Sequence, residues 1–256
     1  MNPEKLAFAV GVVVLAGGSL GLILHRLLPE KHVTGGGKDM VGAVVGLFTL
    51  LSALVLGLLI WTAYGVYAGQ NVAIQTLAAK VLQLDLALSD YGPEAKDARN
   101  QLRQGLGKTI DEVWGSNESD ANFVANNFAA AIHNGRSRDA SLAALHPSTD
   151  AQTQALATAK AAVESIEQSR LQMSFALAAP ISIPLIVIVV AWATLLFFGY
   201  GLMSGGNATS FVAVIVDALG VASAAFLILE LSSPYSGIFR ASSAPLEQVL
   251  AVMGKE

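Results

Sequence analysis

One uninterrupted stretch, Met40 to Tyr91, constrains the fold of this chain more than any other part of its sequence. The stretch contains no proline, and no charged residue occurs in it before Lys80. A single helix of roughly 52 residues is about 75 Å long at 1.5 Å per residue, whereas about 30 Å suffices to cross the hydrocarbon of a bilayer. The stretch therefore predicts one helix that begins in a membrane and continues well into water.

The second half of this stretch carries a regular apolar stripe. Its members recur at alternating steps of three and four residues, which is the spacing of positions a and d in a heptad repeat. Such a seam is awkward to bury within one small chain, so we expect it to pack between the subunits of a homo-oligomer. The predicted oligomer seam consists of Ile74, Leu77, Val81, Leu84 and Leu88.

Charged residues are few and unevenly distributed. They make up 13% of the chain, while 54% of it is apolar, against about 25% charged residues in typical soluble domains. Residues 40–79 and 171–216 carry no charge at all, and most ionisable side chains lie between these two ranges. The pattern predicts two membrane blocks around one soluble, helical block with a solvated surface.

Four apolar segments are long enough to span a bilayer, which makes the expected fold all-α and polytopic. The segments cover approximately Leu6–Leu28, part of Met40–Ala68, Ser174–Met203 and Thr209–Leu231. A helical soluble domain is then inserted between the second and third spans. The predicted domains are 1–68 (spans 1 and 2), 69–172 (helical cytoplasmic domain continuous with the flanking spans), 173–232 (spans 3 and 4) and 233–256 (cytoplasmic tail).

The first segment has two interpretations. Gly17 and Gly21 have the GxxxG spacing that lets membrane helices approach closely. A signal peptide is the competing interpretation, because Lys5 precedes an apolar run and Val14-Leu15-Ala16 is similar to a cleavage site. Cleavage there would leave a very short apolar core, which favours a retained span.

The second segment has the composition of a pore wall. It is free of charge and rich in small and hydroxyl residues, which suits a hydrophobic gate that opens by wetting. Steps of three, four and three residues place four of its side chains on one helix face. The pore-lining candidates are Thr49, Ser52, Leu56 and Leu59. A hydroxyl in a span more commonly bonds the carbonyls of its own helix.

The fourth segment contains two acids, Asp217 and Glu230. A carboxylate inside a span is costly and marks a candidate functional residue. Glu230 lies near the end of the segment, where it also fits an interfacial position, and Asp217 lies about a third of the way in. At about 100° per residue their directions differ by about 140°, so they do not both face one narrow pore.

Several classes of function are excluded or disfavoured. The absence of cysteine excludes disulfides, thiol catalysis and thiolate metal sites, and a net charge of −4 gives no basic footprint for nucleic acid. The charged block contains no nucleophile–base pair, phosphate loop or ligand cluster. We therefore expect no enzymatic activity, no cofactor and no metal site.

A series of short motifs in the carboxyl-terminal part resembles the bacterial bestrophin-like membrane proteins, also called domain of unknown function 4239. The resemblance covers roughly residues 40–250 and includes Tyr91-Gly92-Pro93-Glu94 with Arg99. Ser232 and Ser233 stand where an acid is usual, and Asp217 stands where a small residue is usual. The motifs are Ala191-Trp192, Phe197-Phe198-Gly199-Tyr200-Gly201-Leu202, Gly206-Asn207-Ala208-Thr209, Leu227-Ile228-Leu229-Glu230-Leu231, Pro234-Tyr235-Ser236-Gly237 and Ser242-Ser243-Ala244-Pro245-Leu246.

The resemblance implies four spans, a helical cytoplasmic domain between the second and third, and a bacterial inner (plasma) membrane. A modest excess of Lys and Arg on the side of the soluble block agrees with a cytoplasmic domain. Bestrophins are homo-oligomeric anion channels gated from the cytoplasm, so the resemblance implies channel function by analogy of fold. The acidic soluble block and Asp217 favour cations instead, which leaves the sign of the ion open.

Three functions follow from these observations. The favoured one is a homo-oligomeric ion channel in the lipid bilayer, with its pore along the second span, inorganic ions as partners and no nucleic acid. The alternative is a non-conducting membrane scaffold or sensor whose cytoplasmic amphipathic helices bind a partner. A proton-coupled transporter is the third, and it would require Asp217 to titrate.

Overall fold

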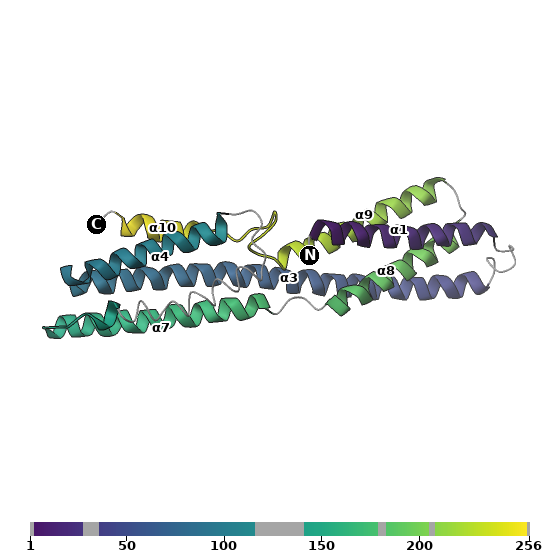
Figure 1. The fold of residues 1–256 in the computed structure, drawn as a ribbon. Helices are drawn as coiled ribbons and strands as arrows, with labels where there is room; N and C mark the ends of the chain where they lie inside the picture. Colours follow the sequence, from purple (N-terminus) through teal and green to yellow (C-terminus); the bar gives the residue numbers. More distant parts are fainter. Residues whose placement is uncertain (1–2, 28–35, 116–140, 179–182, 205–207, 255–256) are drawn as a thin grey trace. The chain divides into compact units, whose positions relative to one another are not determined.

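The structure, a computed structural model, describes residues 3–27, 36–115, 141–178, 183–204 and 208–254 (Figure 1). Every regular element assigned in these ranges is helical, which confirms the predicted all-α class. The elements are α1 (Pro3–Leu27), α3 (Gly36–Tyr91), the 3-10 turn η1 (Pro93–Ala95), α4 (Lys96–Trp114), α7 (Asp150–Ala178), α8 (Ile183–Met203), α9 (Ala208–Leu231) and α10 (Ala244–Met253).

The chain forms two compact units. Unit 1 comprises Met1–Gly65 and Ile181–Ser232, and unit 2 comprises Val66–Pro180 and Ser233–Glu256. The tail after Ser232, which the sequence separates as its own segment, belongs to unit 2. Residues 116–140 of the predicted soluble block lie outside the described residues.

Helix α3 is one continuous helix of 56 residues, as the long proline-free stretch predicts. It ends at Tyr91 because Gly92 adopts a φ of 114°, in the left-handed region that favours glycine. Pro93 then opens η1, where its missing N–H costs no helical hydrogen bond. A glycine cap followed by a proline thus ends one helix and opens the next.

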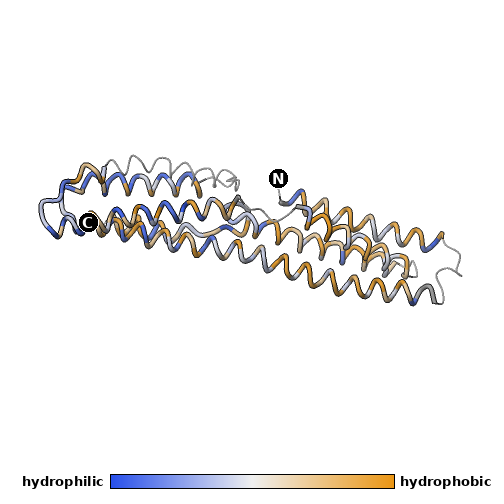
Figure 2. The backbone as a smooth tube through the Cα atoms, turned by 90° about the horizontal axis from the view of Figure 1, so that it is seen from below, coloured by the Kyte–Doolittle hydropathy of each residue, from blue (hydrophilic) through white to orange (hydrophobic). Residues whose placement is uncertain are grey.

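Four helices are long and apolar enough to cross a membrane: Glu4–Leu27, Asp39–Tyr91, Pro184–Met203 and Ala208–Leu231. Figure 2 shows apolar residues over most of the length of α1, α8 and α9. The predicted third span from Ser174 overlaps the end of α7, which is described to Ala178, and α8, which is described from Ile183. Residues 179–182 between them lie outside the described residues. The chain is a membrane protein.

In unit 1, α1 packs along α8 and α9 (Figure 1). The contact with α8 depends on glycine, as the GxxxG pair predicts. A Cβ on Gly21 would overlap the backbone carbonyl oxygen of Phe198, and one on Gly17 would lie 2.6 Å from Thr194 Cγ2. Between membrane helices close van der Waals packing replaces the hydrophobic drive of water. The two glycines thus set how closely α1 approaches its neighbour.

Unit 2 has a core that α3, α4, α7 and α10 build together. Apolar stripes of α4 and α7 both point into it, with Leu102 and Leu106 on one helix and Val163 and Ile166 on the other. Thr149 accepts a hydrogen bond on Oγ1 from the backbone N–H of Gln152 at 3.2 Å, which caps the start of α7. Apolar and polar residues alternate along the helices of unit 2, as Figure 2 shows.

Tyr235 anchors the segment between α9 and α10 in the core of unit 2. Its side chain is 1% exposed, its hydroxyl donates to Gln70 Oε1 at 2.9 Å, and its ring meets Trp114 edge-on at 5.6 Å. Burial raises the pKa of Tyr235 well above its usual range, so the phenol stays a neutral donor. Arg240 then donates to the carbonyl oxygens of Tyr235 and Val113, each at 3.0 Å.

We predict that Gly21→Ala lowers the thermal unfolding midpoint of the purified protein by several degrees. The new methyl group would meet the backbone of Phe198, which has no rotamer by which to move away. Gly46→Ala is the matched control, because a Cβ there meets nothing within 4 Å and alanine is the better helix former. An unchanged midpoint for Gly21→Ala would contradict the tight α1–α8 contact.

Candidate functional site

The face of α3 that the sequence proposes as a pore wall packs against α8. Thr49 Oγ1 donates to the carbonyl of Val45 at 2.8 Å and lies 2.9 Å from the Tyr200 hydroxyl. Phe48 meets Trp192 edge-on at 6.0 Å, beside Thr49 in the sequence. A Cβ on Gly199 would lie 2.5 Å from Val45 Cγ2. These contacts place the two helices side by side.

The predicted pore-lining residues are consequently covered by the chain itself. Ser52 is 6% exposed and Leu59 is 4% exposed, Thr49 is hydrogen-bonded to α8, and Leu56 is half-buried. Steps of three, four and three residues place the four side chains on one face, and all four are buried or half-buried. Within one chain this face packs against α8, and its interpretation as a pore wall stays a prediction.

Ser52 has one property that the other three lack. Its Oγ is buried and has no hydrogen-bond partner within the described parts of the chain. A buried hydroxyl without a partner costs about 1–3 kcal/mol. The hydroxyl thus brings no stability to this helix contact, and removing it should be tolerated.

The opposite face of α3 in unit 1 is apolar and open. Leu50 and Trp61 are both 72% exposed, and Leu54 is 69% exposed. Apolar surface of this extent is covered in the native setting by lipid or by another protein surface. In one chain it has neither, so this face is available to lipid or to a second copy.

The two acids of α9 have opposite surroundings. Glu230 is 3% exposed and buried within the chain, whereas Asp217 is exposed on the surface of unit 1. The helical-wheel prediction that they face different directions is confirmed. Only Asp217 is therefore placed to meet water, ions or another subunit from within a span.

Asp217 has room around it. Ala213 and Gly220 lie about one turn before and after it on the same face, and both are exposed. A Cβ on Gly220 would meet nothing within 4 Å. Among the described residues, none makes a hydrogen bond or an ion pair with the carboxylate of Asp217. The carboxylate thus sits on a small-residue face of α9 without a counter-charge.

The predicted oligomer seam is buried inside unit 2. Its five members are 1–3% exposed and belong to the same core as residues of α4, α7 and α10. In the single chain this stripe on α3 is covered by helices from later in the same chain, and its packing between subunits stays a prediction. The seam consists of Ile74, Leu77, Val81, Leu84 and Leu88.

Sequence reasoning missed a buried ion pair in unit 2. Arg99 Nε and Nη2 each donate to one carboxylate oxygen of Asp85, both at 2.9 Å. Asp85 is 3% exposed, so the pair replaces the water that this carboxylate loses. The available signal was an arginine on the helix that follows the Gly92-Pro93 turn, since such a turn folds α4 back toward α3.

The helices and their composition define the class of this protein. It is an all-helical membrane protein with four candidate spans and a second, helical unit that contains no group of three metal-ligating side chains in its described residues. The model of the Bestrophin-like domain matches residues 11–246. The chain therefore belongs to the bestrophin-like family, as its carboxyl-terminal motifs indicate. No curated protein and no solved structure matches it.

Proposed function

We propose that this protein is the subunit of a homo-oligomeric ion channel whose conducting path passes the Asp217 face of α9. The observation that carries the proposal is the exposed carboxylate of Asp217 within a span. The family assignment supports it, because the family takes its name from the bestrophin channels. The proposed pore helix is thus α9, in place of the α3 face that α8 covers.

The cost of an exposed charge in lipid supports a water-filled path. Insertion scales assign about 2.5–3.5 kcal/mol to an aspartate at the centre of a membrane helix. Such residues consequently face a bundle interior or an aqueous cavity. Asp217 has neither within one chain. A ring of subunits with Asp217 towards its axis would supply the water and would concentrate permeant ions.

A carboxylate in the path favours cations by charge, whereas the likeness to bestrophins favours anions. Both interpretations make Asp217 the residue that determines selectivity. In the first, its charge attracts the permeant ion, and in the second, its charge opposes conduction until it is neutralised. The two interpretations predict opposite effects of removing the charge.

We expect purified protein in liposomes to conduct ions, and Asp217→Asn to change that flux severalfold. Chloride and potassium gradients are tested separately against protein-free liposomes. Lower potassium flux in Asp217→Asn assigns a cation path, and higher chloride flux assigns an anion path. The proposal is overturned if neither gradient drives flux above protein-free liposomes over a range of pH.

Two control variants test whether the change in flux is specific to the Asp217 face. Asp39→Asn removes one negative charge from an exposed site at the start of α3, and it should leave the flux ratio unchanged. Ser52→Ala alters the α3 face that packs against α8, and it should likewise conduct as the wild type does. If Ser52→Ala changes the flux and Asp217→Asn does not, the conducting path runs along α3 and not along α9.

The oligomer is tested independently by cross-linking. Because the chain has no cysteine, Gly220→Cys introduces a single thiol next to Asp217, at a position with open space. Mild oxidation in membranes should yield disulfide-linked dimers if this face lies near the axis of a ring. Leu20→Cys, on α1 and 59% exposed, is the matched control and should remain monomeric. Equal dimer yields would contradict the proposed arrangement.

We also infer that unit 2 is a soluble domain on the cytoplasmic side, in agreement with the bias of Lys and Arg. Single cysteines again provide the test. Lys108→Cys lies on an exposed part of α4, and Ala208→Cys lies at the exposed start of α9. In intact cells an impermeant maleimide should label Ala208→Cys, and Lys108→Cys should react only after permeabilisation. The reverse pattern would invert the topology.

A further inference from the structure

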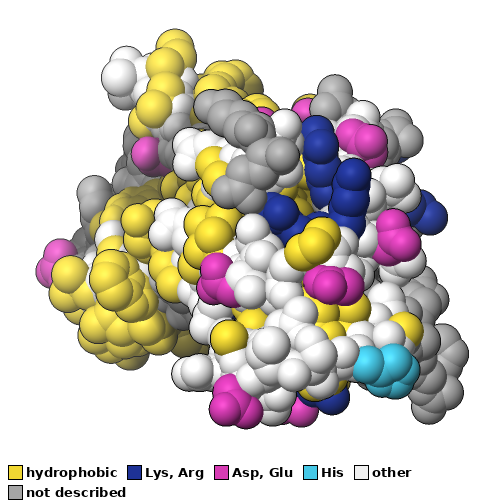
Figure 3. Space-filling view, turned by 90° about the vertical axis from the view of Figure 1, so that its left-hand side faces the viewer, with side chains coloured by type: hydrophobic (Ala, Val, Ile, Leu, Met, Phe, Trp, Pro, Cys, Tyr) yellow, Lys and Arg dark blue, Asp and Glu magenta, His cyan; other side chains and the backbone are white. Residues whose placement is uncertain are grey.

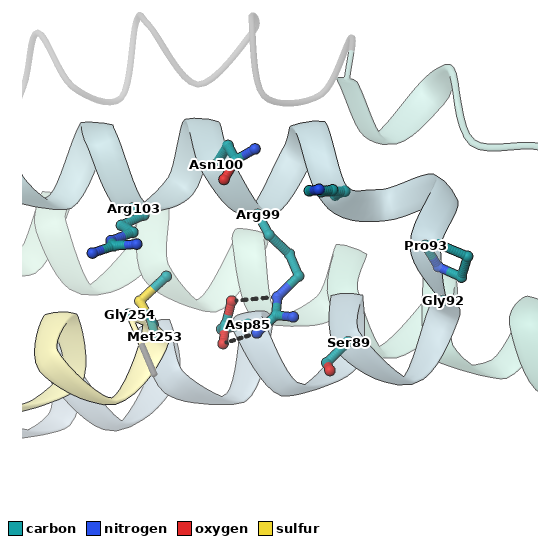
Figure 4. Close-up of a pocket in the computed structure, with 10 residues that line it drawn as sticks. Asp85, Ser89, Gly92, Pro93, Arg99, Asn100, Arg103, Met253 and Gly254 are labelled. Carbon is teal, nitrogen blue, oxygen red and sulfur yellow. Dashed lines mark hydrogen bonds and ion pairs between the residues drawn. The ribbon is translucent and has the colours of Figure 1, made fainter. Parts of the chain in front are cut away.

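Unit 2 contains a pocket of about 380 Å³ where α3, α4 and the end of α10 meet (Figure 4). Helix α3 contributes Asp85 and Ser89 to its wall, and Gly92 and Pro93 form the turn at its edge. Met253 and Gly254 at the end of α10 close another side. The volume lies in the lower part of the range for pockets that hold small organic ligands.

The remaining wall of the pocket is basic. Lys96, Arg99 and Arg103 all line it, together with Asn100. Steps of three, one and three residues place these four on one face of α4. Figure 3 shows a group of adjacent Lys and Arg side chains on this end of the molecule, with other Lys and Arg side chains apart from it. Residues 70–172 carry nine basic and twelve acidic side chains and are therefore acidic overall. A local concentration of positive charge in this region is thus unexpected.

The one acid among the described residues that line the pocket is already neutralised. Arg99 holds both carboxylate oxygens of Asp85 at 2.9 Å, as Figure 4 shows. In a bidentate pair of this kind, the positive and the negative charge compensate each other. Asp85 is therefore not available to balance Lys96 or Arg103, and the wall keeps a net positive charge.

Lys96 and Arg103 have no hydrogen-bond or ion-pair partner among the described residues. Lys108 on the same helix differs, because it lies 3.6 Å from Glu112 one turn later. The guanidinium of Arg103 lies beside Gly254, because a Cβ added to that glycine would be 2.7 Å from Arg103 Nη2. Two cations thus lie at one cavity without a described acid to pair with.

We propose that this pocket binds a small molecule that carries a phosphate monoester. A phosphate dianion matches the two uncompensated charges, and the planar fork of Arg103 suits two of its oxygens. Lys96 adds a compact charge with three donors. The organic part of the ligand would lie against Met253 and Pro93, the apolar members of the wall. The binding site is independent of whether the spans conduct ions.

Direct titration of the full-length protein in detergent tests the proposal. AMP and inorganic phosphate are the probes, in a chloride buffer of low ionic strength. We expect saturable binding of AMP, and about tenfold weaker binding in Lys96→Gln and in Arg103→Gln, the loss that follows removal of one charge-assisted hydrogen bond. Both side chains are exposed, so the thermal unfolding midpoint should stay within about a degree of the wild type.

Lys108→Gln is the matched control, because it removes the same charge from the same helix outside the pocket wall. It should bind AMP as the wild type does. The proposal fails if the wild type binds neither probe, or if Lys108→Gln weakens binding as much as Lys96→Gln does. The second result would mean that AMP binds through the overall positive charge of α4 and not in the pocket.

The source of the phosphate group is resolved by a third probe. Dioctanoyl phosphatidic acid presents the same monoester on a lipid and is titrated below its micellar concentration. Binding of AMP and inorganic phosphate, with no gain for the lipid, assigns the pocket to a soluble metabolite. Tighter binding of the lipid that still depends on Lys96 and Arg103 assigns it to a headgroup. If Lys96→Gln, Arg103→Gln and Lys108→Gln bind every probe with the same affinity, both assignments are overturned.

Discussion

The hydrocarbon of the bilayer leaves the backbone of an apolar span no hydrogen-bond partner except itself, and the rest of unit 1 follows from this constraint. Helices satisfy every backbone group within the segment. With no water to drive them together, they must then associate by close packing. Gly17 and Gly21 provide that packing between α1 and α8. The polar bond between Thr49 and Tyr200 adds a second link, between α3 and α8.

The helices of unit 2 differ from the apolar spans, because each combines an apolar stripe with polar faces. The heptad seam of α3 is covered by α4, α7 and α10, so the chain builds its own bundle. Tyr235 fixes the segment between α9 and α10 to this bundle through Gln70 and Trp114. The apolar stripes are buried inside the bundle, and the scaffold interpretation, in which these helices bind a partner, stays a prediction. Unit 2 also contains the basic pocket beside Asp85.

Two carboxylates in one span illustrate how burial separates structural from functional candidates. Glu230 is enclosed by the chain, and Asp217 is exposed within α9. An enclosed acid contributes to one protomer, whereas an exposed acid in a span requires something outside the protomer. In the proposed channel, a water-filled path reaches Asp217. The subunits must then be arranged with this face of α9 towards the axis of the ring. The phosphate pocket offers a chemically distinct site whose ligand would be bound by unit 2.

The sequence by itself determined the helices, the four apolar spans, the glycine contact of α1 and the carboxyl end of α3, because these depend on local composition and on a 3.6-residue period. It also placed Thr49, Ser52, Leu56 and Leu59 on one face. Only the tertiary structure decided what that face and the heptad seam meet, since periodicity specifies a direction around the helix and not the partner found there. The partners, α8 for one face and α4, α7 and α10 for the seam, come from distant parts of the chain. The pairing of Asp85 with Arg99 and the basic wall beside it depend on the same long-range packing.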